Sequence, residues 1–181
     1  MVAIEAIENS LNQNQNLTQE LKDNFLELIA LFNKKFPEIS LENLNKRLST
    51  LKFEKLNRYV TMEVSKYDPI TNTLKINEER LQKDVDAKHV LMYELLSILT
   101  AKDNYTGFNY NHQFEALNIG YTEILANYLV GNETEEFVHA DEIIATNLIS
   151  ISIGNDVLLH AYFNNDYIML SKSLIDAGIE L

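Results

Sequence analysis

The side chains that could perform chemistry gather in two apolar segments of the chain. Glu94 lies in the first segment with His89 five positions before it, and Glu123 lies in the second with His112 shortly before it. Carboxylate and imidazole groups serve as general bases and as metal ligands. The chain has no cysteine, which excludes thiolate catalysis and zinc sites built on sulfur. Any metal site must therefore use His, Asp or Glu side chains.

The segment 90–100 has the apolar spacing of a core helix and carries a second pattern as well. Tyr93 and Ser97 are four positions apart, so they share one face of a helix, and Glu94 follows the first of them. This arrangement resembles the His-Glu-x-x-His segment of zincin metallopeptidases. In that segment the two histidines bind zinc and the glutamate polarises the attacking water. Tyr93 and Ser97 stand at the two histidine positions, and Glu94 stands at the position of the base.

A second resemblance follows in the segment 114–125. It is similar to the gluzincin helix in which Asn-Glu supplies the third zinc ligand and an acid one turn later supports a zinc-bound histidine. Asn118 and Glu123 match this pattern, whereas Ile119 replaces the ligand. The resemblance extends over residues 57–130. It implies a gluzincin-like scaffold in which all three zinc-ligand positions have been lost.

Such a scaffold would be a pseudoenzyme. A catalytic zinc lowers the pKa of bound water to roughly 7, and Glu94 alone cannot do so. Neither a tyrosine nor a serine hydroxyl replaces an imidazole ligand at neutral pH. The resemblance therefore implies no metal, no cofactor and a vestigial base at Glu94. Tyr93 and Ile119 are expected to fill the former metal cavity, with Ser97 and Glu123 hydrogen-bonded nearby.

The two acidic residues also have structural interpretations. Glu94 could instead be a surface carboxylate or a helix cap. Glu123 could accept a hydrogen bond from Tyr93 or Ser97, or face water. These alternatives stay open at the level of sequence.

A metal-dependent hydrolase with unorthodox ligands is the enzymatic alternative. His89 lies one helical turn before the tyrosine of the motif and His112 precedes the next helix, so His89, His112 and Glu94 form the candidate ligand set. His139 and His160 stand alone in the sequence, as surface or core histidines usually do.

An aromatic segment connects the two motif helices, where a peptidase would have a wall of its cleft. Such a cluster can recognise a peptide or a base, although interleaved aromatic residues more often anchor a loop to the core. Its members are Tyr105, Phe108, Tyr110 and Phe114, with Gly107 among them.

Two amphipathic helices are predicted in the first third of the chain. Apolar residues recur at three- and four-residue steps over residues 18–35, with Thr18 as the N-cap. Ser40 can cap a second helix, on which Lys46 and Arg47 point outward. The Asn- and Gln-rich residues before them predict only a short or frayed helical lead-in.

The hydrophobic period changes twice in the rest of the chain. It becomes two between residues 57 and 77, which predicts an antiparallel hairpin with a turn that starts at Asp68-Pro69. From residue 84 onward the pattern is helical and is interrupted by glycines. The predicted helices span residues 84–102, 115–130, 134–152, 156–164 and 166–177.

Charge is distributed unevenly along the chain, whose formal net charge is −12. Residues 1–100 hold 15 acidic and 13 basic side chains, whereas residues 101–181 hold 12 acidic side chains and only Lys102 and Lys172 as basic ones. Direct nucleic-acid binding is not expected, because it requires a surface that neutralises phosphates. The acidic half is either a solvated, solubilising surface or a face for a basic partner. In the latter case it could act as an inhibitor that mimics nucleic-acid charge.

Membrane contact is not expected either. No apolar run approaches the roughly 20 residues of a membrane span, and the N-terminus lacks the basic start and apolar core of a signal peptide. These features predict a soluble, cytoplasmic protein.

Together these patterns predict an α+β, predominantly α-helical fold. We expect a minimal zincin-like domain over residues 1–181 with a small antiparallel sheet, and a length of 181 residues suits one domain. As a function we expect a catalytically inactive metallopeptidase-like protein that acts as a protein-binding module. The predicted parts are N-terminal helices over 1–52, the hairpin 57–77, the former motif helices over 84–130 and a C-terminal helical cap over 134–181.

Overall fold

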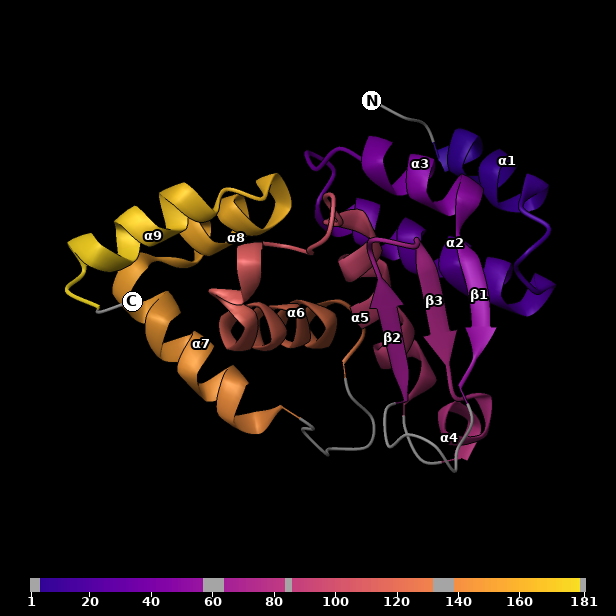
Figure 1. The fold of residues 1–181 in the computed structure, drawn as a ribbon. Helices are drawn as coiled ribbons and strands as arrows, with labels where there is room; N and C mark the ends of the chain where they lie inside the picture. Colours follow the sequence, from indigo (N-terminus) through magenta and orange to yellow (C-terminus); the bar gives the residue numbers. More distant parts are fainter. Residues whose placement is uncertain (1–3, 57–63, 84–85, 132–138, 180–181) are drawn as a thin grey trace.

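Helices dominate the computed structural model, which describes residues 4–56, 64–83, 86–131 and 139–179. Figure 1 shows a three-stranded sheet beside the N-terminal helices, with the C-terminal helices on the other side of the molecule. The predominantly helical α+β fold class is therefore confirmed. The helices are α1 (Ile4–Gln13), α2 (Gln19–Lys35), α3 (Glu42–Thr50), α4 (Glu78–Lys83), α5 (Ala87–Leu99), the 3-10 turn η1 (Tyr110–His112), α6 (Glu115–Val130), α7 (Ala140–Ile153), α8 (Asn155–Asn164) and α9 (Tyr167–Asp176).

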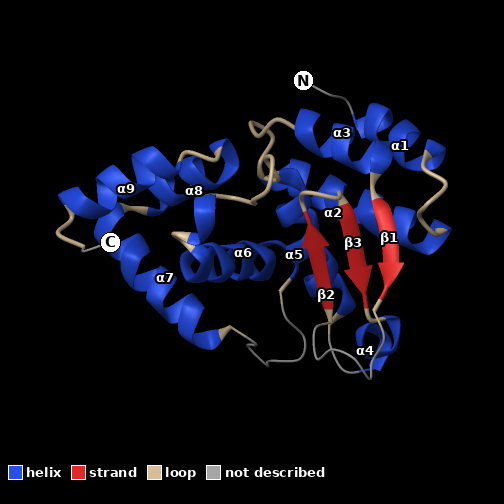
Figure 2. Cartoon of the chain, in the orientation of Figure 1, coloured by secondary structure: helices blue, strands red, loops and turns tan. Residues whose placement is uncertain are grey.

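The sheet is mixed and has the strand order β1-β3-β2 (Figure 2). The predicted hairpin is present as β2 (Ser65–Asp68) and β3 (Thr73–Ile76), which pair antiparallel. The prediction of a purely antiparallel sheet is wrong, because β1 (Lys52–Lys55) pairs parallel with β3. The predicted strand residues 57–63 lie outside the described part of the chain.

Helices α2 and α5 pack against each other, and α5 also contacts strand β2. Leu74 and Ile76 of the central strand are buried and belong to the hydrophobic core. Helix α5 is buried nearly all round, since it also contacts α3 and α6. The expected apolar residues of α5, Leu91, Leu95, Ile98 and Leu99, all lie in this core.

The N-terminal segment is more ordered than its composition indicates. Ile7 and Leu11 are one helical turn apart on α1 and are fully buried. The buried Asn14 side chain donates hydrogen bonds to the backbone oxygens of Leu48 and Leu51, 2.8 and 2.9 Å away. Asn14, a residue type typical of loops, thus links α1 to the end of α3.

Local signals set several of the helix ends. The Thr18 hydroxyl accepts from the Leu21 amide, which confirms the predicted N-cap of α2. Helix α5 stops at Leu99, short of the predicted residue 102, because the chain turns tightly at 102–105, where Lys102 and Tyr105 form an isolated bridge.

The C-terminal helices form a second layer around α6. Helix α7 packs on α6 at Gly120, where an added Cβ would overlap the backbone oxygen of Glu142 and the Thr146 hydroxyl. No single helix in the described ranges is long and apolar enough to cross a membrane, although α7 and α8, bent by 110°, meet the criterion together by length and composition.

Candidate functional site

Helices α5 and α6 pack side by side and bring the motif positions together. Asp86 caps the start of α5, where its carboxylate accepts from the amides of Lys88 and His89. Because His89 contacts Glu123 and Gly131, the beginning of α5 lies beside the C-terminal half of α6.

Glu94 is not a surface carboxylate. Its side chain is 3% exposed and accepts a 2.6 Å hydrogen bond from the hydroxyl of Ser65 on β2. A buried carboxylate requires such a donor to compensate for lost hydration. Glu94 therefore joins α5 to the edge strand of the sheet.

Tyr93 and Ser97 stand where the resemblance expects the two histidines of the motif. Burial raises the pKa of Tyr93 well above its usual value, and the nearby Glu94 carboxylate raises it further. Glu123 of α6 and Glu142 of α7 act in the same direction, so the phenol is neutral. The Ser97 hydroxyl donates to the Tyr93 backbone oxygen at 3.1 Å, within its own helix.

Two neighbouring residues on α6 differ in their contacts. Ile119, where the resemblance expects the third zinc ligand, is half-buried. The buried Asn118 side chain accepts from the Phe108 amide at 3.2 Å and donates to the Thr106 hydroxyl at 3.4 Å. Asn118 thus holds the loop that connects α5 and α6.

Glu123 pairs with His89. Its carboxylate lies 2.6 Å from the His89 Nε2, and the His89 Nδ1 lies 3.0 Å from the Gly131 backbone oxygen. Neither sequence alternative for Glu123 is found, because its partner is His89 rather than Tyr93 or Ser97 and its side chain is only 13% exposed.

The surroundings of His89 favour its charged form. Both ring nitrogens face oxygens that only accept, so both must carry a proton to form these hydrogen bonds. Burial alone would lower the pKa of His89, but the Glu123 carboxylate and the Gly131 carbonyl outweigh it and raise the pKa. The pair is a buried ionic contact between the two motif helices.

The side chains of the alternative metal-ligand set, His89, His112 and Glu94, do not come together. His112 is 83% exposed and lies 3.3 Å from the Glu115 carboxylate, while His89 is committed to Glu123. His139 makes only a 3.9 Å contact with Glu142. Within the described ranges, no three His, Asp or Glu side chains converge in a group that could hold a metal ion.

The aromatic segment between the motif helices packs inward. Phe108 is fully buried with its ring against those of Tyr121 and Tyr162, and Tyr105 and Phe114 are also buried. The sequence left open whether these rings recognise a ligand or anchor a loop. Their burial favours the anchor.

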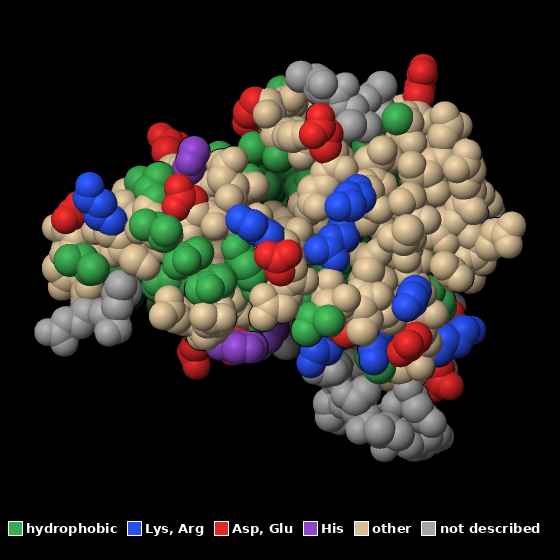
Figure 3. Space-filling view, turned by 45° about the horizontal axis from the view of Figure 1, so that its top comes forward, with side chains coloured by type: hydrophobic (Ala, Val, Ile, Leu, Met, Phe, Trp, Pro, Cys, Tyr) green, Lys and Arg blue, Asp and Glu red, His purple; other side chains and the backbone are tan. Residues whose placement is uncertain are grey.

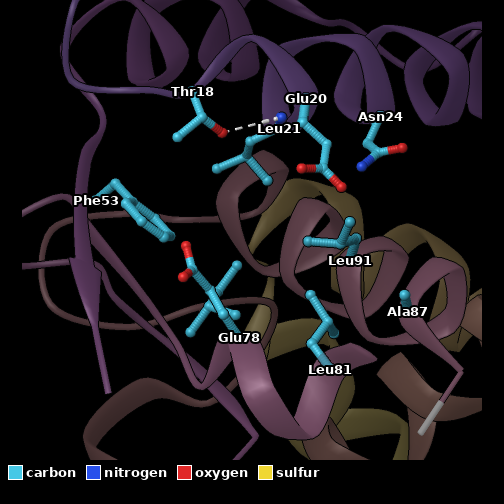
Figure 4. A pocket seen from close by; sticks show the side chains of 10 residues that line it. Thr18, Glu20, Leu21, Asn24, Phe53, Glu78, Leu81, Ala87 and Leu91 are labelled. Atoms are coloured by element: carbon cyan, nitrogen blue, oxygen red, sulfur yellow. Dashed lines mark hydrogen bonds between the residues drawn. The ribbon is translucent and has the colours of Figure 1, made fainter. Parts of the chain in front are cut away.

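A cavity of about 340 Å³ lies on another side of α5 (Figure 4). Its wall on α5 is made by Ala87 and Leu91, and Leu91 is two positions from Tyr93, on the opposite side of the helix. Figure 4 shows the Glu20 and Glu78 side chains at different edges of this cavity. None of the motif positions lines it.

The sequence did not reveal the two apolar faces of α7. Its inner face packs on the core through Ile149 and Ile153. Its outer face exposes Ile144, Leu148 and Ile151 by 58%, 62% and 82%. Figure 3 shows hydrophobic side chains gathered on the part of the surface formed by the C-terminal helices. The available signal was that the apolar residues of this helix are not confined to one face.

No protein family, curated protein or solved structure matches this chain.

Proposed function

We propose that this chain is a catalytically inactive, gluzincin-like protein that binds a protein partner through its acidic C-terminal half. The loss of catalysis is supported by the three former ligand positions, Tyr93, Ser97 and Ile119. These side chains offer zinc no imidazole or carboxylate. The cytoplasmic location predicted from the sequence remains part of this proposal.

The observation that carries the binding role is the second apolar face of α7. Ile144, Leu148 and Ile151 follow a helical i, i+4, i+7 spacing and are mostly exposed. Apolar residues on the outer face of a helix normally pack against another surface, and an exposed apolar stripe is typical of an interaction surface. We call these three residues the α7 stripe.

The acidic charge around the α7 stripe favours a basic partner. The half of the chain that carries the α7 stripe has 12 acidic and two basic side chains, and Asp141 is exposed beside the stripe. A second copy of this chain would bring two strongly acidic halves together, which electrostatic repulsion opposes. The occupant that fits is an amphipathic helix of another protein, with one apolar face and flanking lysines or arginines.

The first experiment tests the lost metal site. Wild-type protein dialysed against zinc should hold no stoichiometric metal by elemental analysis. The triple variant Tyr93→His, Ser97→His and Ile119→Glu should gain zinc if these positions correspond to gluzincin ligands. The matched control has the same two histidines but carries its glutamate at the exposed Ala116. Circular dichroism checks that both variants keep their helices.

Two results would contradict this part of the proposal. Stoichiometric zinc in the wild type would restore the metal-dependent alternative. Zinc uptake by the triple variant no better than by its control would show that the gluzincin correspondence is wrong.

The second experiment tests the α7 stripe with a synthetic helical peptide that has leucines on one face and lysines on its flanks. Fluorescence anisotropy should detect binding that weakens with added salt. The variant Ile144→Gln, Leu148→Gln and Ile151→Gln should weaken it by roughly tenfold or more, since each buried aliphatic side chain contributes about 1.5–3 kcal/mol. Ile70→Gln, at an isoleucine exposed elsewhere, serves as the control. Equal binding by both variants would exclude the α7 stripe.

A further inference from the structure

A second cavity, lined by none of the motif positions and by none of the α7 stripe, lies beside α3. It measures about 320 Å³ and is formed by three segments that are far apart in the sequence. Figure 3 shows Lys and Arg side chains grouped near the middle of one face of the molecule. The lining residues are Asn43, Lys46, Arg47, Thr50, Asn72, Ala101, Lys102 and Asp103.

Asparagine side chains hold the three segments in place. The Asn43 amide donates to the backbone oxygens of Leu99 and Ala101, each at 2.8 Å, and so ties α3 to the end of α5. The Asn72 amide donates to the Arg47 backbone oxygen at 2.9 Å, which ties the β2–β3 turn to α3. A cavity built in this way is preorganised, so a ligand need not order its walls.

The guanidinium group of Arg47 is fixed as well. Its Nη1 donates to the Pro69 backbone oxygen at 2.7 Å and to the Tyr67 hydroxyl at 3.2 Å. Burial raises the pKa of Tyr67 to about 12, so the phenol is a neutral acceptor. Both hydrogen bonds use Nη1, and within the described residues Nε and Nη2 have no hydrogen-bond acceptor, so these donors can serve a ligand.

The cavity lining is net positive, whereas the whole chain has a net charge of −12. Lys46, Arg47 and Lys102 face a single acidic lining residue, Asp103. None of the three cations forms an ion pair with an acidic side chain in the part of the chain that the structure describes. Lys102 is also one of only two basic residues after residue 100. Cations that line a hollow without nearby acidic partners attract an oxyanion.

We infer that this cavity binds a small ligand that carries a phosphate group. An arginine fork and two lysine ammonium groups match the charge and oxygens of a phosphate. The volume falls at the lower end of the range for ligand pockets, which is roughly 300–1,000 Å³. A nucleic acid is the less favourable occupant, because its phosphates would meet the repulsion of a chain with a net charge of −12.

The test is isothermal titration calorimetry, in which inorganic pyrophosphate is titrated into the full chain. We expect saturable binding that Lys46→Ala combined with Lys102→Ala weakens by roughly tenfold or more, since it removes two cationic hydrogen-bond donors from the cavity. The matched control combines Lys34→Ala with Lys172→Ala, which makes the same change in net charge at exposed lysines elsewhere. This control should bind pyrophosphate as the wild type does.

Two results would overturn the inference. One is the absence of saturable pyrophosphate binding by the wild type at millimolar concentrations. The other is an equal loss of affinity in both lysine pairs, which would assign the binding to overall charge. A single-stranded oligonucleotide titrated in parallel should bind more weakly than pyrophosphate, and tighter binding would assign the cavity to a nucleic acid. Neither the zinc experiment nor the α7 peptide experiment affects these outcomes.

Discussion

At the scale of single residues, the structure places an ionic hydrogen bond beside positions where the resemblance expects zinc ligands. His89 and Glu123 connect the two motif helices, and the Gly131 carbonyl holds the second nitrogen of the imidazole. Glu94 connects the same helix to Ser65. Polar contacts between side chains thus join α5 both to α6 and to the sheet.

The His89–Glu123 pair predicts a pH dependence of stability. The pKa of His89 is raised in the folded protein, so the folded chain binds this proton more tightly than the unfolded chain does. The stabilisation is complete below the ordinary histidine pKa of about 6.5 and is lost as the pH rises through the raised folded-state value. Urea unfolding of the wild type should show this loss.

The variant Glu123→Gln isolates the effect. It should cost roughly 1–3 kcal/mol below about pH 6.5, because it removes a charged acceptor from a buried imidazolium, and cost less at higher pH. His112→Gln, at an 83% exposed imidazole, is the control and should leave the profile unchanged. A constant difference between Glu123→Gln and the wild type at all pH values would show that His89 does not titrate in this range.

The sequence could place these residues on helices but could not pair them. His89 and Tyr93 do lie one turn apart on α5, as the spacing predicts. Which acid on α6 meets which of them depends on how the two helices are rotated against each other, and local periodicity does not encode this rotation. For the same reason the sequence predicted Lys46 and Arg47 as outward residues and missed their shared cavity with Lys102.

At the scale of elements, the helices and the β2–β3 hairpin were predicted well, whereas strand β1 was missed. Helices α2, α6 and α8 match their predicted ranges closely, and local signals mark one end of each: Thr18 caps α2, Gly131 ends α6 and Gly154 precedes α8. Strand β1 has four residues, most of them exposed, and its partner β3 comes after an intervening strand. Neither property leaves a local period that the sequence could reveal.

The contact between α6 and α7 predicts the sign of a substitution. Helix propensity alone favours Gly120→Ala by roughly 1 kcal/mol. The added Cβ would overlap the Glu142 backbone oxygen, and forcing extra volume into a packed interface costs roughly 1–3 kcal/mol. We therefore expect net destabilisation in urea unfolding.

Combining Gly120→Ala with Thr146→Ala separates the two neighbours of the new Cβ. The second substitution removes the hydroxyl but leaves the Glu142 carbonyl in place. The double variant should therefore have a lower free energy of unfolding than the Thr146→Ala single variant. A stabilised Gly120→Ala protein would show that α7 does not press on α6 at this point.

At the scale of the whole molecule, the concentration of acidic side chains after residue 100 opposes folding and favours a basic partner. Exposed ion pairs such as Lys55–Glu78 and Lys88–Glu27 contribute little, because water screens them. The repulsion among the acidic side chains is also screened by salt. The repulsion should outweigh the ion pairs, because Lys102 and Lys172 are the only exposed lysine or arginine side chains in the described part of the chain after residue 100.

Moderate salt should therefore stabilise the free protein while it weakens binding to a basic peptide. The stability is best measured by urea unfolding at increasing sodium chloride, because guanidinium would itself screen the charges. Asp176→Asn should be more stable than the wild type at low salt, since it removes a negative charge at the C-terminal end of α9, where the helix dipole disfavours it. This advantage should shrink as salt is added. A wild-type stability that falls with salt would instead mean that ion pairs outweigh the repulsion, and would remove the electrostatic argument for a basic partner.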